Sequence, residues 1–341
     1  MDDEYHYWIT GIIAHQAGFT ESEAQTIAYS SQYVDDNCIG VKVQDEDSNS
    51  IFANHISQTI NILKPKRRLM RIYPIFHFVP GDPLAESARR RDGKMHILTT
   101  TPGSRNVNRL LDRAFHADDV SRLYRIGIAT HAYADSWAHQ NFIGWFDDFN
   151  AVGDNVIPNI GHADIQHEPD IVGNRWIDNR ILDKKIDNNR RYAEASKALF
   201  NRYRNYLIGM KRYTEADAPR WEDFENDLMI LLATNSKKRR KSNQKKRIGR
   251  YKAFAPWLEE YDELKWFNAA VKTKVRGMRD MRSDFLKEIT LFRDEYRWRD
   301  PEKKHLTDWY KFQAAVKENV KYGIELLRPI FEQMNVDIVK A

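Results

Sequence analysis

Apolar residues recur along most of this chain at the spacing of one helix face. Over residues 4–17 they fall three or four positions apart, which predicts a helix with one buried side. Thr20 and Glu23 have the spacing of a capping box, so a second helix should begin there and run to about residue 34. The same criterion predicts helices at 106–114, 118–140, 187–213, 219–235, 255–296 with possible breaks, and 304–334.

Three segments depart from helical spacing. Residues 39–52 alternate apolar and polar positions beside a turn-like cluster, which predicts a short hairpin or an irregular loop. Residues 72–81 are apolar and aromatic with a proline near each end, and we expect them to run extended through the interior. Residues 141–170 are loop-rich, and loops of this length more often have a function than merely connect two elements.

Composition favours helix over strand as well. The 341 residues include only 15 Gly and 11 Pro, which predicts an all-α protein built as a multi-helix bundle. The single cysteine, Cys38, excludes an internal disulfide framework and a Cys-rich zinc finger. The sequence has no run of about 20 apolar residues and no visible signal peptide. We therefore expect a cytoplasmic protein, with a mature chain recorded without its leader as the alternative.

Charge divides the chain into two parts. Residues 1–170 carry 15 Lys and Arg against 23 Asp and Glu, whereas residues 171–341 carry 39 against 26. Ten of the 11 histidines lie in the acidic part. We therefore predict a helical core with the candidate chemistry at residues 1–175, and C-terminal helices packed on that core at residues 176–341.

A basic stretch interrupts the predicted C-terminal helices. Residues 237–252 hold ten Lys and Arg and no acidic residue, which predicts a mobile loop. Two interpretations stay open, a solvated insertion or a contact with the phosphate groups of nucleic acid or anionic lipid. The oligomeric state is left open by the sequence.

The candidate chemistry begins with a row of polar residues in the helix predicted over 118–140. His131, Asp135 and His139 lie four residues apart, and each such step turns a helix by about 40° and advances it by about 6 Å. All three therefore lie on one face, with the histidines roughly 12 Å apart along the axis. This row suits a site with more than one metal ion, bridged by Asp135. The alternative is a row of packed, hydrogen-bonded core residues.

The first half of the chain supplies further residues of the same kind. His77 lies in an apolar run, where a histidine must be hydrogen-bonded or ligated. Imidazole and carboxylate ligands without thiolates favour zinc, here two or three ions, with other divalent metals as alternatives. Such clusters usually carry out phosphoester chemistry. The candidates besides the central row are His6, Asp35, Asp36, His55, His77, His162, Asp164, His167 and Asp170.

The order of these residues resembles that of the zinc-dependent phospholipase C and S1/P1 nuclease superfamily, which is all-helical and has a trinuclear zinc site. The resemblance covers roughly residues 1–170 and includes the His-xxx-Asp pair at residues 131 and 135. It implies a bundle of the phospholipase C/P1 nuclease type, extended by additional C-terminal helices.

The resemblance also implies a set of ligands, in which Asp135 bridges two zinc ions. One zinc would be held by His131, by Asp36 or Asp35, and by His55 or His77. Another would be held by His139, His162 and a carboxylate, Asp170 or Asp164, and a third would be served by His6. A group of uncharacterised bacterial proteins is more closely similar around residues 5–7, 32–36, 76–78 and 130–140, and that similarity favours His77 over His55.

Two classes of function are compatible with these observations. The first is a metal-dependent hydrolase, a phosphodiesterase or phospholipase C-like enzyme acting on phospholipid or nucleic acid. Asp36 or Asp35 would be the general base for a zinc-bound water, beside a catalytic Asp135. The second is a non-enzymatic helical binding protein with a structural metal and a basic partner-binding surface. Three aromatic residues would stack on a base or line a lipid groove, unless they are core: Trp137, Phe142 and Trp145.

Overall fold

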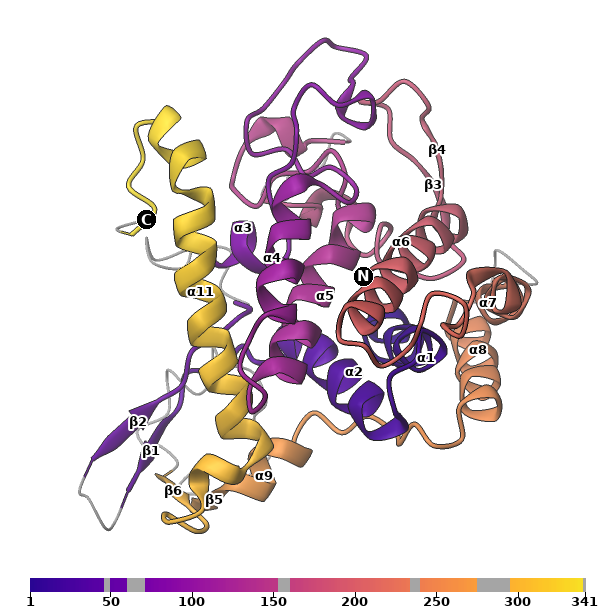
Figure 1. Ribbon diagram of the computed structural model, residues 1–341. Helices are drawn as coiled ribbons and strands as arrows, with labels where there is room; N and C mark the ends of the chain where they lie inside the picture. The colour runs from indigo at the N-terminus through magenta and orange to yellow at the C-terminus, as the bar shows by residue number, and fades with distance from the viewer. Residues whose placement is uncertain (46–49, 60–70, 153–159, 234–239, 275–294, 340–341) are drawn as a thin grey trace.

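The computed structural model describes residues 1–45, 50–59, 71–152, 160–233, 240–274 and 295–339. Figure 1 shows long helices gathered around α5, with small sheets at the margins of the bundle. The α-helices are α1 (Thr10–Gln16), α2 (Glu21–Asp36), α3 (Ile72–Phe76), α4 (Arg105–Phe115), α5 (Arg122–Ala138), α6 (Asn188–Gly209), α7 (Glu225–Leu232), α8 (Arg240–Phe254), α9 (Lys265–Ala270) and α11 (Asp308–Gln333). A π-helical segment, η1 (Glu4–Ile9), precedes α1, and 3-10 turns cover Glu86–Ala88, Asp148–Asn150, Ala163–Ile165, Trp221–Asp223 and Lys304–Leu306.

The described chain is mostly helical, which confirms the mainly α character predicted from the sequence. The helix expected over residues 4–17 forms as η1 followed directly by α1. The capping box at the start of α2 is present: the hydroxyl of Thr20 accepts from the backbone N–H of Glu23, and Glu23 accepts from the backbone N–H of Thr20. The segment left open as a hairpin or loop forms a hairpin, β1 (Lys42–Gln44) with β2 (Ile51–Ala53).

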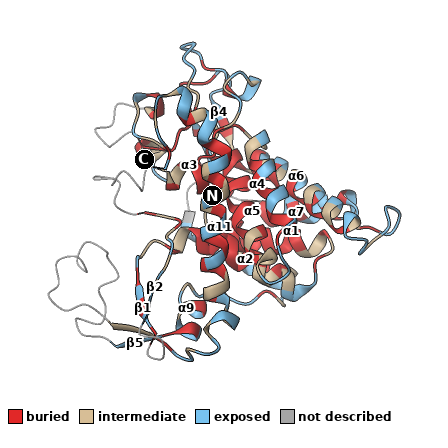
Figure 2. Cartoon of the chain, turned by 60° about the vertical axis from the view of Figure 1, so that its left-hand side comes forward, coloured by how far each residue is buried: buried red, intermediate tan, exposed pale blue. Residues whose placement is uncertain are grey.

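Helix α5 is the centre of the bundle. It packs against α2, α4, α6 and α11, and every residue from Ile126 to Ala138 is buried. Figure 2 shows this central part of the bundle almost wholly in the colour of buried residues. A helix covered on all sides must be apolar all round or must have its polar side chains paired. His131 and Asp135 therefore require partners inside the bundle.

Helices α2 and α5 cross closely at Gly127. A Cβ atom at this position would lie 2.4 Å from the Cβ atom of Ser30 and 2.6 Å from the carbonyl oxygen of Ile27, well inside van der Waals contact. The absence of a side chain at Gly127 thus allows the approach of the two helices, and with it the distance between Asp35 on α2 and His131 on α5.

Two small sheets are the main departure from the predicted helices. In the larger sheet β1 pairs with β2 and also, in parallel, with β6 (Glu295–Trp298), which pairs with β5 (Val271–Lys274). Residues 271–274 and 295–296 were expected within a helix over 255–296 with possible breaks, and that prediction is wrong for these residues. Polar and apolar residues alternate along β6, and the buried Trp298 ring packs 5.7 Å from the Trp309 ring on α11. A second pair joins β3 (Arg175–Ile177) to β4 (Lys185–Asp187).

The segment at residues 72–81 also differs from the prediction. It was expected to run extended, but residues 72–76 form α3 and His77 caps its C-terminal end. Pro74 lies within the first turn of α3, where a proline removes no intrahelical hydrogen bond. The proline therefore did not exclude a short helix.

The basic stretch is the third departure. The loop predicted over 237–252 is helical from residue 240, within α8, and residues 237–239 lie outside the described residues. Arg247 is buried because its guanidinium donates to the buried carboxylate of Glu4, with Nε–Oε2 and Nη2–Oε1 distances of 2.7 and 2.6 Å. Lys241, Lys245 and Lys246 of α8 are exposed, so contact with an anionic partner stays a prediction for them. Across the described residues, we find no helix with the length and apolar character needed to cross a membrane.

Replacing Gly127 with alanine should destabilise the protein by about 1–3 kcal/mol, since the added Cβ atom forces α2 and α5 apart. The matched control is Gly249→Ala on α8, where a Cβ atom would meet nothing within 4 Å. Alanine there should raise the free energy of unfolding by up to about 1 kcal/mol through helix propensity. Urea unfolding of both variants measures the difference. Equal effects in the two variants would contradict a close crossing at Gly127.

Candidate metal centre

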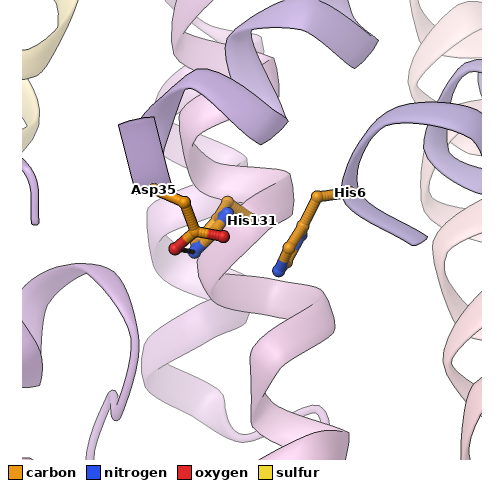
Figure 3. A group of neighbouring side chains, drawn as sticks. All are labelled: His6, Asp35 and His131. Atoms are coloured by element: carbon orange, nitrogen blue, oxygen red, sulfur yellow. Dashed lines mark ion pairs between the residues drawn. The ribbon is translucent and has the colours of Figure 1, made fainter. Parts of the chain in front are cut away.

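Three segments far apart in the sequence bring the first group of side chains together. Figure 3 shows His6 from η1, Asp35 from the last turn of α2, and His131 from α5. The rings of His6 and His131 are stacked, with centroids 3.8 Å apart. Asp35 Oδ1 lies 3.7 Å from His131 Nε2. All three offer one ligand atom to a common point, within 4.8 Å of one another.

Asp135 joins this group to a second one. Its Oδ1 atom lies 3.1 Å from His6 Nε2, and its Oδ2 atom lies 3.2 Å from His131 Nε2 and 3.4 Å from His77 Nδ1. His77, His131 and Asp135 therefore form a buried group that could hold a metal ion. Because His131 is shared, the two groups adjoin each other.

A third group lies beyond the end of α5. His139 is the C-cap residue of that helix, and its Nε2 atom lies 3.0 Å from Asp170 Oδ1. His162 Nε2 lies 3.2 Å from Asp170 Oδ2. The Nδ1 atom of His139 is also 3.6 Å from Asp135 Oδ2, so the third group continues from the second.

Hydrogen bonds to backbone carbonyl oxygens fix the orientation of most of these histidine rings. In four of them, one ring nitrogen lies at hydrogen-bond distance from a carbonyl oxygen: His131 Nδ1 to Ser31 (2.9 Å), His77 Nε2 to Ser57 (3.0 Å), His139 Nδ1 to His77 (2.8 Å) and His162 Nδ1 to Gln166 (2.6 Å). A carbonyl oxygen only accepts, so each of these nitrogens carries the proton. In the neutral form of such a ring the opposite nitrogen presents a lone pair, and in the protonated form it carries a proton and a positive charge. Metal-binding histidines are held in this way.

Two of these lone pairs face each other. His77 Nδ1 and His131 Nε2 lie 3.0 Å apart, and the outer nitrogen of each ring already donates to a carbonyl. Two lone pairs at this distance repel unless a proton or a cation lies between or beside them. The carboxylate of Asp135 next to both rings favours a positive charge at this position.

Neighbouring charges set the ionisation of the groups in the centre. Burial would raise the pKa of Asp135, but the charges of His139, the Met1 amine and His131 hold that pKa well below its usual range. Burial would lower the pKa of His131, but Asp135 and Asp35 raise it. For His6, burial and the neighbouring His131 lower the pKa to about 3. The carboxylate of Asp135 is thus charged.

The α-amino group of Met1 also lies in the centre. Its nitrogen is 2.5 Å from Asp135 Oδ1 and 3.2 Å from Asp170 Oδ1. Burial would lower the pKa of this amine, but Asp135 and Asp170 raise it to about 11. The ammonium group therefore compensates two of the buried carboxylates.

The groups border a cavity of about 470 Å³. Its polar wall includes Asp35, Asp135, Asp170 and the three histidines at 77, 139 and 162. Its apolar lining includes Tyr73, Phe78 and Ile160. The Phe78 ring stacks on that of His139 at a centroid distance of 4.4 Å, so the aromatic wall touches the third group directly.

The structure brings together eight of the predicted ligands: His6, Asp35, His77, His131, Asp135, His139, His162 and Asp170. Three alternatives left open by the sequence lie outside the three groups found among the described residues. Asp164, the alternative to Asp170, is buried and accepts from the backbone N–H of Val152 at 2.8 Å. Asp36 accepts hydrogen bonds from Tyr261 (2.6 Å) and Gln32 (3.1 Å), and burial raises its pKa to about 6. His55 is exposed in the loop that follows β2, and its backbone N–H donates to the side chain of Gln313.

The aromatic residues predicted to bind substrate are not among those that line this cavity in the described chain. Phe142 is fully buried beneath the guanidinium of Arg180, 4.0 Å from its ring centroid. Trp145 packs on Phe331 of α11. Trp137 is buried, and its ring would contact a Cβ atom at Gly103. Tyr73 and Phe78 line the cavity instead. Their closeness to His77 in the sequence could have indicated this.

The fold and the centre define a mainly helical protein with a buried histidine–carboxylate site able to hold metal ions. Residues 1–327 match the model of a family described as a family of unknown function (DUF6765), and the chain belongs to that family. The search of curated proteins found no match, and the search of solved structures found none either.

Zinc should bind to the native protein and raise its melting temperature. At a free concentration one hundred times the dissociation constant, a single site contributes about 2.7 kcal/mol. His77→Ala should lose most of this rise, whereas His55→Ala, the matched control outside the groups, should keep it. Calorimetry with and without zinc, together with elemental analysis by plasma mass spectrometry, measures both. A native protein without bound transition metal, whose melting is unchanged by zinc, would exclude the metal centre.

Proposed function

We propose that this protein is a metal-dependent hydrolase of phosphoesters, with zinc in its histidine–carboxylate centre. The observation that carries the proposal is the 3.0 Å approach of His77 Nδ1 and His131 Nε2 beside Asp135, with the outer nitrogen of each ring at hydrogen-bond distance from a carbonyl oxygen. Imidazole and carboxylate ligands without a thiolate suit zinc, and the three adjoining groups suggest two or three ions.

Adjoining sites of this kind suit phosphoryl chemistry. When bound, such ions acidify a water molecule and neutralise charge on the phosphate oxygens. The chain's own residues supply the orientation. Asp135 links the His6 side of the centre, through Oδ1, to the side of His77 and His139, through Oδ2. A substrate phosphate in the cavity would therefore meet several ligating groups at once.

Asp35 is the best placed general base. Its side chain is 26% exposed, against 1% for Asp135 and 11% for Asp170, and it lines the cavity. An attacking water in the cavity can thus reach its carboxylate, which would accept the water's proton. The amide of Gln58 lies 3.5 Å from Asp35 Oδ1 and limits how the carboxylate turns.

The substrate is proposed as a phosphodiester, a phospholipid or a nucleic acid. Both classes place an apolar or aromatic group beside the phosphate, which Tyr73 and Phe78 could contact. The order of the ligands along the chain and the helical bundle support a likeness to the phospholipase C and S1/P1 nuclease superfamily. The cytoplasm is the proposed compartment.

The zinc-loaded protein should hydrolyse bis-p-nitrophenyl phosphate. Asp135→Asn should reduce the rate by at least about 100-fold, because the amide removes the negative charge between the metal-binding groups. A cooperative thermal transition of the variant would show that the fold persists. Hydrolysis at the native rate by Asp135→Asn would remove Asp135 from the centre. A zinc-loaded native protein without hydrolysis would instead favour a structural metal.

Adjacent acidic residues provide a matched test of the base. Asp35→Asn should lower kcat by about 100-fold or more, because the proton acceptor is lost, and the metal content of the same sample shows whether the group of His6, Asp35 and His131 has also lost its ion. Asp36→Asn alters the same helix turn but faces Tyr261, so its kcat should stay within about twofold of native, the scatter expected for a group outside proton transfer. Steady-state kinetics of the two variants at saturating zinc decides between them, and a larger loss in Asp36→Asn would reverse the assignment.

A further inference from the structure

Helix α6 presents a second polar row to the metal centre. Asn188, Tyr192 and Ser196 lie four residues apart, so they share one face of the helix, and all three are fully buried. A buried helix face is normally apolar, and polar groups on it need specific partners. Their partners belong to two segments that carry candidate ligands.

The amide of Asn188 holds the backbone around Asp170. Its Nδ2 atom lies 2.8 Å from the carbonyl oxygen of Glu168, 3.2 Å from that of Pro169 and 2.9 Å from that of Ile171. Its Oδ1 atom accepts a 3.0 Å hydrogen bond from the indole of Trp176. Both ends of the amide are therefore engaged, and the donor end faces the residues on either side of Asp170.

Tyr192 holds the same backbone one turn further along α6. Its hydroxyl donates to the carbonyl oxygen of Pro169 at 2.8 Å. Ser196 continues the row: its hydroxyl donates to the carbonyl oxygen of Tyr192 and accepts from the hydroxyl of Tyr5 at 3.0 Å. Tyr5 precedes His6, so α6 contacts the segment before one ligand as well as the loop of another.

We propose that Asn188 and Tyr192 are positioning residues, which hold the Asp170 carboxylate in place for a metal ion shared with His139 and His162. The inference rests on the proposed metal centre. Asp170 lies on a loop rather than a helix, so its own backbone does not determine where its side chain points. Hydrogen bonds to the carbonyls at 168, 169 and 171 fix that backbone on both sides. Residues that orient ligands in this way usually change metal affinity by about 10–100-fold when they are replaced.

The test compares two buried tyrosines of α6. Tyr192→Phe removes the hydrogen bond to Pro169, and Tyr203→Phe removes one to the hydroxyl of Thr130 on α5. Both side chains are fully buried, so the two variants should lose similar stability. Only Tyr192→Phe should lower the affinity for a metal ion, by about 10-fold. Asn188→Ala removes the hydrogen-bond donor to three carbonyl oxygens, so it should lower the affinity for the same ion further.

Cobalt(II) is the probe, since its visible absorption reports the geometry and occupancy of each ion. His162→Ala identifies the absorption that belongs to the group of His139, His162 and Asp170. In Tyr192→Phe and Asn188→Ala, this absorption should need a higher cobalt concentration and should be lost first to a competing chelator. In Tyr203→Phe it should titrate as in the native protein.

The outcomes separate the two proposals. Native cobalt binding with equal affinity in all variants, or an equal loss in Tyr203→Phe, overturns the positioning role and leaves the metal centre intact. A native protein that binds neither cobalt nor zinc overturns both. Phosphoester hydrolysis is not part of this readout, so an inactive but metal-binding protein affects the proposed function and not the role of Asn188 and Tyr192.

Discussion

The rest of this structure depends on the burial of one carboxylate, that of Asp135. An ionised carboxylate in a protein interior is very unfavourable unless positive charge and hydrogen bonds surround it. Asp135 is 1% exposed, and the Met1 amine, His6, His77 and His131 surround its two oxygens. The bundle therefore places its polar groups where a metal ion could add further positive charge beside this carboxylate.

The residues of the centre come from distant parts of the chain. Helix α5 and its C-cap contribute three of these residues, and the others lie on η1, the end of α2, the end of α3 and the 160–171 loop. The site therefore exists only when the helices have packed, and a metal bound there would stabilise the whole bundle. Helix packing and the site meet at Gly127, because the close approach that it allows between α2 and α5 sets the position of Asp35 relative to His131.

Backbone carbonyls and a strained turn complete the centre. Gln166 adopts φ 54° and ψ −125°, a conformation that costs a residue with a side chain about 1–3 kcal/mol. Its carbonyl oxygen accepts from His162 Nδ1 at 2.6 Å, so the strain coincides with the orientation of a candidate ligand. Together with the amide of Asn188, this gives the loop that carries His162 and Asp170 a single defined geometry.

The sequence by itself determined most of the helices, the capping box of α2, and the row formed by His131, Asp135 and His139, because spacing along one helix reports which residues share a face. It left Asp35 and Asp36 open, since neighbours on a helix point about 100° apart and only the packing of α2 on α5 decides which faces the centre. It left His55 and His77 open because they lie on separate segments, and only the packing of the end of α3 against α5 brings His77 beside His131. Arg247 was expected in a loop because its partner, Glu4, lies 243 residues away. The strands at 271–274 and 295–298 likewise depend on pairing partners that no local pattern contains. Tertiary packing therefore decided between candidate ligands of the same residue type, because only packing brings residues that are distant in the sequence together.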